Sequence, residues 1–332
     1  MKIRFIGVVT VATLVAAVAA CGGPPTDAGD TTASAAPTAI ENCGQRVTVT
    51  TAPRRAITLE QNATEILLSL GLADRMVGTS YQTDPVLPAL ADEYRTVPVL
   101  AKLYPAREAV LTAKPDFLYS TFTSAYAPDA AGPRADHAAL GIPAYLSPFA
   151  CENPADGRAT MTFDALFDQI REVATLFGVP DRGDELVAEQ RKRLDAAVAT
   201  GTSSHGTSAL WYYSGTSTPY VAGRNGVPAA ISTLLGLDNV YGDAEQTWPA
   251  GSWETIASRD PDVIVLADLT RGGDGDSAAS KIAYLKKNPA TARLTAVRGN
   301  RFVTVSGSSM DPSIRSVDAV EQVSAGLGTV RS

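Results

Sequence analysis

The chain has 332 residues, of which 45% are hydrophobic and 19% are charged, and its formal net charge is -7. This composition is typical of a globular protein long enough for two domains, and it excludes collagen-like, coiled-coil and largely disordered chains. The negative charge argues against a nucleic-acid-binding protein, because neutralising phosphates requires clustered Lys and Arg. The two histidines, His137 and His205, stand far apart in sequence, so we expect no histidine-rich metal centre.

The first 20 residues have the pattern of a secretory signal peptide. Two basic residues precede an uncharged run from Phe5 to Ala20, which is shorter than the roughly 20 apolar residues of a transmembrane helix. Small residues and Cys21 follow, as in a bacterial lipoprotein signal, where cleavage before the cysteine accompanies lipidation of its thiol. We therefore expect an extracytoplasmic protein anchored to the bacterial cell membrane through lipidated Cys21. An uncleaved short anchor with a chance cysteine is the alternative.

Residues 21–44 are expected to form the lipidated cysteine and a flexible tether. Residues 22–40 are rich in Gly, Pro, Thr, Ala and Ser and contain no aromatic residue, so this segment cannot bury enough apolar surface to fold. Cleavage removes two positive charges, so the exported chain carries a formal charge of -9. Cys43 and Cys151 then remain, an even number in an oxidising compartment. We predict a disulfide between them, and two free thiols are the alternative.

From residue 45 onward, short apolar runs alternate with helical patterns, which is typical of α/β architecture. An N-terminal lobe is expected over residues 45–160. Its first helix is expected to be capped by Asn62, with Glu65 three residues later, and to end at Gly71. Further helices are expected over Arg107–Ala113 and residues 132–140, and strands over Ala56–Leu59, Met76–Ser80, Phe117–Ser120 and Gly141–Leu146.

Residues 161–200 form a predicted helical connection between two lobes. Apolar residues recur at helical spacing from Phe163 to Phe177, and Asp184–Val198 has an apolar stripe opposite charged residues. The second of these segments corresponds to a helix of about four turns that spans roughly 22 Å. Such a helix is long enough to bridge two lobes.

Residues 201–332 form the predicted C-terminal lobe, in which the motifs of the first lobe recur in the same order. A Glu-x6-Pro-Asp pattern begins at Glu108 and again at Glu254, and Leu-Gly-Leu occurs at residues 70–72 and 235–237. We interpret the chain as two similar α/β lobes bridged by a long backbone helix. Convergence of the two halves without common ancestry is the alternative.

The order of these motifs resembles the periplasmic binding proteins with a helical backbone, which are the solute receptors of ABC importers for ferric siderophores, haem and vitamin B12. The resemblance covers residues 45–330, and its main segments are 55–67, 108–116, 219–223 and 248–254. Glu60-Gln61 replaces the Ser-Pro pair that is common in the first segment. The resemblance implies the class III periplasmic binding protein fold, with ligand bound between the lobes.

Ligands of α/β folds bind at loops that follow the carboxyl ends of strands, and in this chain those loops carry aromatic and charged residues. Aromatic faces can cover a large planar or chelated ligand, and Arg can pair with its anionic oxygens. The candidate ligand-binding residues are Glu60, Gln61, Tyr81, Tyr104, Phe122, Tyr126, Tyr220, Arg224, Trp248 and Arg271. The resemblance favours Trp248 and Tyr220, and packing in the core or at the rim is the alternative for each aromatic residue.

The arginines bear on the charge of the ligand. Most of them are expected to be solvated surface charges. Two or three arginines lining the cleft of a protein at -9 would indicate an anionic ligand. The arginines in question are Arg134, Arg224, Arg271 and Arg315.

Glu108 and Glu254 each stand in the first turn of a short predicted helix, one in each lobe, where the helix dipole alone favours an acidic residue. The resemblance adds a second role, because such a glutamate on each lobe forms a salt bridge with arginines of the membrane permease. We therefore predict that both residues dock the protein on its transporter.

Together these observations predict a lipid-anchored solute-binding component of an ABC importer that binds an iron(III)-siderophore complex between its lobes. Iron would enter inside the chelate, so no resident cofactor is expected, and the expected partners of the monomer are the permease with its ATPase and the membrane. Alternatives are a receptor for haem, a corrinoid or another bulky anionic metabolite such as a deazaflavin precursor. A secreted lipoprotein hydrolase is a distant alternative. The Ser-rich stretch 305–310 lacks the G-x-S-x-G pattern, so we predict that the protein is not an enzyme.

Overall fold

The structure is a computed structural model that describes residues 37–201 and 206–331. The expected signal peptide, Cys21 and His205 lie outside the described residues, as do residues 22–36 of the expected tether. Among the helices of the described ranges, none combines the length and the apolar character needed to cross a membrane.

The described chain begins with a hairpin that a disulfide joins to the first lobe. Strands β1 (Thr38–Asn42) and β2 (Gln45–Val49) pair antiparallel, so ordered structure begins inside the segment expected to be a tether. Cys43 lies in the turn and is bonded to Cys151, 108 residues away, with a Cα–Cα distance of 5.1 Å. Closing a loop of this length restricts the unfolded chain and stabilises the fold by about 4–5 kcal/mol.

Arg134 fixes this hairpin to the first lobe and is not the solvated surface charge that was expected. It is 7% exposed, and it donates to the side chain of Asn42 at 2.6 Å and to the carbonyl of Ala144 at 2.9 Å. A buried guanidinium needs acceptors for its N–H groups, and the hairpin and strand β7 (Ala144–Leu146) supply them.

The first lobe is built on a five-stranded parallel sheet with the strand order β5-β4-β3-β6-β7. Its strands are β3 (Ala56–Thr58), β4 (Met76–Ser80), β5 (Val99–Ala101), β6 (Phe117–Ser120) and β7 (Ala144–Leu146). Its helices are α1 (Gln61–Ser69), α2 (Ala91–Tyr94), α3 (Arg107–Thr112) and α4 (Arg134–Ala139). Helix α1 begins earlier than predicted, because Glu60 and not Asn62 is its N-cap: the Glu60 carboxylate accepts from Asn62 N at 2.6 Å.

The second lobe has the same architecture. Its strands are β8 (Thr207–Ser214), β9 (Tyr220–Val221), β10 (Leu237–Asn239), β11 (Val263–Asp268) and β12 (Phe302–Ser306). Its helices are α7 (Val227–Leu235), α8 (Trp253–Arg259), α9 (Ala278–Lys287) and α10 (Thr295–Arg298). The parallel order β10-β8-β11-β12 matches β4-β3-β6-β7 of the first lobe, and β9 pairs antiparallel with β8. The prediction of two similar α/β lobes is confirmed.

The repeated sequence motifs have the same roles in both lobes. The glycine of each Leu-Gly-Leu follows a helix with a left-handed backbone, Gly71 after α1 at φ 67° and Gly236 after α7 at φ 65°. The aspartate of each Pro-Asp accepts a backbone hydrogen bond near the start of the neighbouring strand. Asp116 does so beside β3 at 2.9 Å, and Asp262 does so in β8 at 3.0 Å. The repeat therefore reflects how each sheet is assembled.

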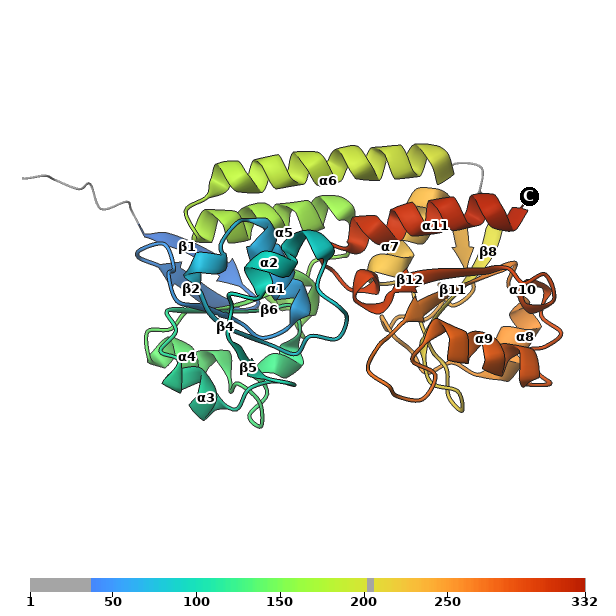
Figure 1. The fold of residues 1–332 in the computed structure, drawn as a ribbon, viewed down its shortest axis with the longest axis horizontal. Helices are drawn as coiled ribbons and strands as arrows, with labels where there is room; N and C mark the ends of the chain where they lie inside the picture. The colour runs from blue at the N-terminus through green and yellow to red at the C-terminus, as the bar shows by residue number, and fades with distance from the viewer. Residues whose placement is uncertain (1–36, 202–205, 332) are drawn as a thin grey trace, which may run out of the picture. The chain divides into compact units, whose positions relative to one another are not determined.

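Three helices run along one side of the two sheets (Figure 1). Helix α5 (Phe163–Leu176) packs on α6 (Pro180–Gly201), and α6 packs on α11 (Ser316–Arg331). With 22 residues, α6 is longer than predicted and spans about 33 Å. The approach of α5 requires glycine at Gly183, because a Cβ there would lie 2.6 Å from the Cβ of Ala174. Helix α6 is thus the backbone helix that bridges the lobes, as predicted.

A buried ion pair also joins the lobes directly. Arg315, just before α11, donates to both carboxylate oxygens of Glu65 on α1, with Nε 2.6 Å from Oε2, and to the carbonyl of Pro85 at 2.6 Å. The Glu65 and Arg315 side chains are 0% and 7% exposed. Next to them, Asp84 accepts from the backbone N–H of Ser308 at 2.8 Å. Arg315 is therefore a structural charge between the lobes, and the expectation that it is solvated is wrong.

Replacing Glu65 with Gln should destabilise the protein by about 3–5 kcal/mol, because it leaves the Arg315 charge buried without a partner. Equilibrium unfolding in urea measures this change. The matched control is Glu41→Gln, which breaks the pair with Arg46 between side chains that are 72% and 69% exposed. The control should change the free energy of unfolding by less than about 1 kcal/mol. Equal effects of the two substitutions would contradict a structural role for the buried pair.

Candidate ligand-binding site

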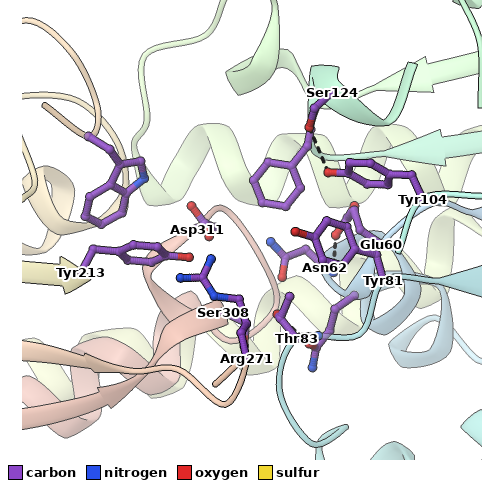
Figure 2. Close-up of a pocket in the computed structure, with 13 residues that line it drawn as sticks. Glu60, Asn62, Tyr81, Thr83, Tyr104, Ser124, Tyr213, Arg271, Ser308 and Asp311 are labelled. Carbon is purple, nitrogen blue, oxygen red and sulfur yellow. Dashed lines mark hydrogen bonds between the residues drawn. The ribbon is translucent and has the colours of Figure 1, made fainter. Parts of the chain in front are cut away.

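The two lobes enclose a cavity of about 250 Å³ whose lining comes from both of them (Figure 2). Five lining residues are aromatic: Tyr81, Tyr104, Phe122, Tyr213 and Trp248. Five are polar and neutral: Gln61, Asn62, Thr83, Ser124 and Ser308. Three carry ionisable charges: Glu60, Arg271 and Asp311.

The aromatic residues form one wall on each lobe. In the first lobe, the Tyr81 and Tyr104 rings meet edge to face with centroids 4.6 Å apart. In the second lobe, the rings of Tyr213 and Trp248 lie 4.6 Å apart, and the guanidinium of Arg271 sits 5.6 Å from the Tyr213 centroid. Figure 2 shows Tyr213 on one side of the cavity and Tyr81 and Tyr104 on the other. A ligand between the lobes would therefore contact aromatic surface on two sides.

Several lining residues follow the carboxyl ends of parallel strands, which explains why they meet. Glu60 follows β3, Tyr81 follows β4, and Ser308 follows β12. Tyr81 is a non-glycine residue with φ at 48°, in the left-handed region. This conformation costs about 1–2 kcal/mol, and such residues concentrate at functional sites. The strained backbone conformation thus occurs at a residue whose side chain lines the cavity.

Gln61 lines the cavity, but hydrogen bonds to the protein occupy its side chain. Its Oε1 accepts from the backbone N–H groups of Thr83 at 2.9 Å and Asp84 at 2.8 Å, and its Nε2 donates to Glu65 at 3.2 Å. The amide therefore holds the loop that carries Thr83 in place. Its contribution to the site is to position other residues.

Glu60 is a buried carboxylate whose oxygens are taken up by the protein. They accept from the backbone N–H groups of Asn62 at 2.6 Å, Thr121 at 2.8 Å and Ala63 at 3.2 Å. Burial raises the pKa of Glu60 to about 6, although these hydrogen bonds lower it in part. Glu60 thus brings negative charge to the cavity while it caps α1.

Asp311 is the second carboxylate of the lining. Burial, together with the charges of Glu60 and Asp84, raises its pKa to about 7, although a hydrogen bond from Trp248 and the charge of Arg271 lower it in part. The guanidinium of Arg271 is itself paired with Asp276 at 2.8 Å. The lining therefore contains two carboxylates and one arginine, and that arginine is already paired with Asp276.

Seven of the ten candidate binding residues lie at this cavity: Glu60, Gln61, Tyr81, Tyr104, Phe122, Trp248 and Arg271. Three do not. Tyr126 is 6% exposed in the core of the first lobe, where its hydroxyl donates to a backbone carbonyl at 2.8 Å. Tyr220 is 46% exposed on β9, and Arg224 pairs with Glu245 at 2.6 Å on the surface. The side chains of these three residues therefore lie in the core or in solvent.

Six lining residues were missed by sequence reasoning: Asn62, Thr83, Ser124, Tyr213, Ser308 and Asp311. The rule of strand ends could have found Tyr213, which is next to last in β8, and Ser308 just after β12. Asp311 follows a short 3-10 turn, Gly307–Met310, and has no such signal. Because Arg271 is the only one of the four discussed arginines at the cavity, the condition for an anionic ligand is not met.

The two predicted docking residues are both exposed. Glu108 lies in the first turn of α3 and Glu254 in the first turn of α8. Within residues 37–201 and 206–331, neither carboxylate takes part in an ion pair, and no group of three or more His, Cys, Asp and Glu side chains is arranged to hold a metal ion.

Replacing Asp311 with Asn should stabilise the protein more at pH 8 than at pH 5. Its pKa is about 7 in the folded state against an ordinary 3.8, so its stabilising contribution is complete below pH 4 and is lost as the pH rises through 7. Asn imitates the protonated acid, and we expect Tm to rise by about 2–4 °C at pH 8. The control is Asp243→Asn, at an exposed aspartate whose pKa a hydrogen bond from Arg259 lowers, and this should not stabilise at either pH. An equal rise in Tm at both pH values would contradict the assignment.

Comparison with known proteins shows to which family this arrangement belongs. The sequence matches the family described as periplasmic binding protein over residues 57–307. A vitamin B12-binding protein of Vibrio cholerae is 25% identical over 277 residues, covering 81% of this chain and 87% of the relative.

Two solved structures resemble the fold closely. A periplasmic binding protein from Veillonella parvula has a TM-score of 0.76 at 28% identity, covering 88% of this chain and 97% of that one. An ABC-type Fe3+-hydroxamate transport system structure from Saccharomonospora viridis has a TM-score of 0.73 at 26% identity, covering 88% and 99%. The match over most of the chain, together with two lobes around a shared cavity, shows that this chain belongs to the periplasmic binding protein family.

Proposed function

We propose that the protein is the solute-binding component of an ABC importer, and that it binds an iron(III)-siderophore complex in the cavity between its lobes. The observation that carries this proposal is the pair of facing aromatic walls, Tyr81 with Tyr104 and Tyr213 with Trp248. Two walls on different lobes suit a bulky ligand that touches both. The similar structure from Saccharomonospora viridis, named as an ABC-type Fe3+-hydroxamate transport system, supports the same ligand class.

The cavity is small for a ferric chelate. At about 250 Å³, it lies just below the usual range for small-molecule sites, so a ferric chelate would part the lobes a little or extend from the opening. Iron in this proposal is cargo that its chelator holds. The protein's own part is to supply aromatic contact, hydrogen bonds and charge.

A corrinoid is the second candidate ligand. The Vibrio cholerae relative that matches 81% of this chain is named for binding vitamin B12. A corrin ring is large and planar, so it could also lie between facing aromatic walls. The named relatives are binding proteins, and we propose binding without catalysis for this chain.

We further propose that lipidated Cys21 anchors the monomer outside the cell membrane, and that Glu108 and Glu254 dock it on arginines of the permease. The two glutamates occupy equivalent positions of the repeat, at the start of α3 and α8. Both helices lie away from α6 (Figure 1). One exposed acidic side chain per lobe suits a partner that contacts both lobes at once.

Binding can be measured by tryptophan fluorescence, because Trp248 lines the cavity while Trp211 and Trp253 are 0% and 6% exposed. Ferric hydroxamate should quench this fluorescence saturably, and ferric catecholate, ferric citrate, haem and cobalamin test the alternatives. We expect Trp248→Ala to weaken binding about tenfold or more, as measured by calorimetry. Tyr220→Ala, which changes a second-lobe aromatic residue outside the cavity, should leave affinity unchanged. Saturable binding of none of these compounds would overturn the proposal.

Two variants test the proposed membrane anchor and the proposed docking residues separately. Cys21→Ser should release the protein from the membrane fraction, because a single lipidated cysteine is the proposed anchor. Glu108→Arg with Glu254→Arg should abolish uptake, because both charges that face the permease are reversed. Both variants should keep the ligand affinity of the wild type. Undiminished uptake by the charge-reversed variant, or membrane retention of the Cys21 variant, would contradict the respective role.

A further inference from the structure

We propose that the cavity selects a chelate with neutral or positive overall charge, and that Asp311 receives a cationic or N–H group of that chelate. This inference rests on the proposed function and narrows its ligand class. It departs from the expectation that arginines in the cleft would favour an anionic ligand.

The lining of the cavity carries more negative than positive charge. Two carboxylates, Glu60 and Asp311, line the cavity together with a single guanidinium, that of Arg271. Arg271 is not free to neutralise an anionic ligand, because it pairs with Asp276 at 2.8 Å and Asp276 is 4% exposed. An anion entering the cavity would meet a negative lining.

A third carboxylate, that of Asp84, adds negative charge near the lining. Asp84 is 7% exposed, and its Oδ2 accepts from the side chain of Ser306 at 2.8 Å and from Ser308 N and Oγ at 2.8 and 2.6 Å. Its Oδ1 is buried without a hydrogen-bond partner in the described structure. The charge of the nearby Arg315 is already paired, because its Nε and Nη2 donate to Glu65 in a buried pair.

Asp311 is the carboxylate that can reach a ligand. The oxygens of Glu60 are taken up by three backbone N–H groups, and Asp84 is not among the residues that line the cavity. Asp311 forms no ion pair in the described part of the chain, and Figure 2 shows it between Tyr213 and Glu60. The aromatic rings on both sides add to the preference, since their faces attract cations.

The pH dependence of binding follows from the groups around Asp311. Glu60, Asp84 and Arg271 act on its charge, a hydrogen bond from Trp248 favours the ionised form, and the neutral hydroxyls of Tyr104 and Tyr213 lie within its influence. Because its pKa is about 7, Asp311 is largely protonated at pH 6 and ionised at pH 8. A cation binds the ionised form better, so its affinity should rise by up to about tenfold from pH 6 to pH 8.

The test uses one ferric chelate in three charge forms. A linear ferric trihydroxamate with a terminal ammonium is compared with its N-acetylated, neutral form and its N-succinylated, anionic form. For the wild type we expect affinity to fall about tenfold for each step from cation to anion. For Asp311→Asn, each step should change the affinity by about threefold or less, and the pH dependence above pH 7, where Glu60 is already ionised, should disappear. Asp243→Asn, which removes an equal charge outside the cavity, should behave like the wild type.

The outcomes distinguish this inference from the proposed function. If the wild type binds the anionic form as tightly as the cationic form, the charge preference is wrong and the function as a chelate receptor stands. If Asp311→Asn keeps the full charge dependence of the wild type, the preference arises elsewhere and the role of Asp311 is refuted. If no form binds, both the inference and the function as a ferric hydroxamate receptor are overturned. Should the variant fail to fold, the charge series and pH profile of the wild type decide the preference.

Discussion

The buried ion pair between Glu65 and Arg315 is the contact on which the geometry of the cavity depends. It joins α1 of the first lobe to the residue before α11 of the second, and both side chains are almost fully buried. Removing two charges from water is expensive unless their hydrogen bonds are satisfied. Here Glu65 also accepts hydrogen bonds from Gln61 and Leu87, and Arg315 also donates to the carbonyl of Pro85. These bonds fix the orientation of both side chains.

The same pair links the fold to the site. Gln61 contacts Glu65 with its N–H and the loop of Thr83 and Asp84 with its oxygen, so one amide connects the ion pair to the cavity lining. Asp84 then reaches across to Ser308 in the second lobe. With α6 along one side and this network between the lobes, large opening would break many buried polar contacts at once. The lobes are therefore built for small movements around a bulky ligand.

The fold could be predicted because its signals are local and occur twice. Helix-ending glycines, Pro-Asp before a strand and apolar runs each act within a few residues, and strand ends placed seven of the ten candidates at the cavity. Arg315 and Glu65 could not be paired from the sequence, since 250 residues separate them and each resembles an ordinary surface charge. Tyr220 was wrongly predicted because it lies on the short strand β9, where its side chain is exposed, and not in a loop at the cavity. Asp311 was missed because a 3-10 turn moves it beyond the strand end.

The environment of Asp311 is unfavourable for the stability of the empty protein. Its carboxylate lies near Glu60 and Asp84, and burial and these charges raise its pKa, which means that the ionised form weakens the empty protein near neutral pH. Tyr81 adds strain of another kind through its left-handed backbone. The disulfide and the α6–α11 contact lie outside the cavity and stabilise the fold independently of it. That separation lets the cavity keep charges and conformations that would be unfavourable in a fold selected for stability alone.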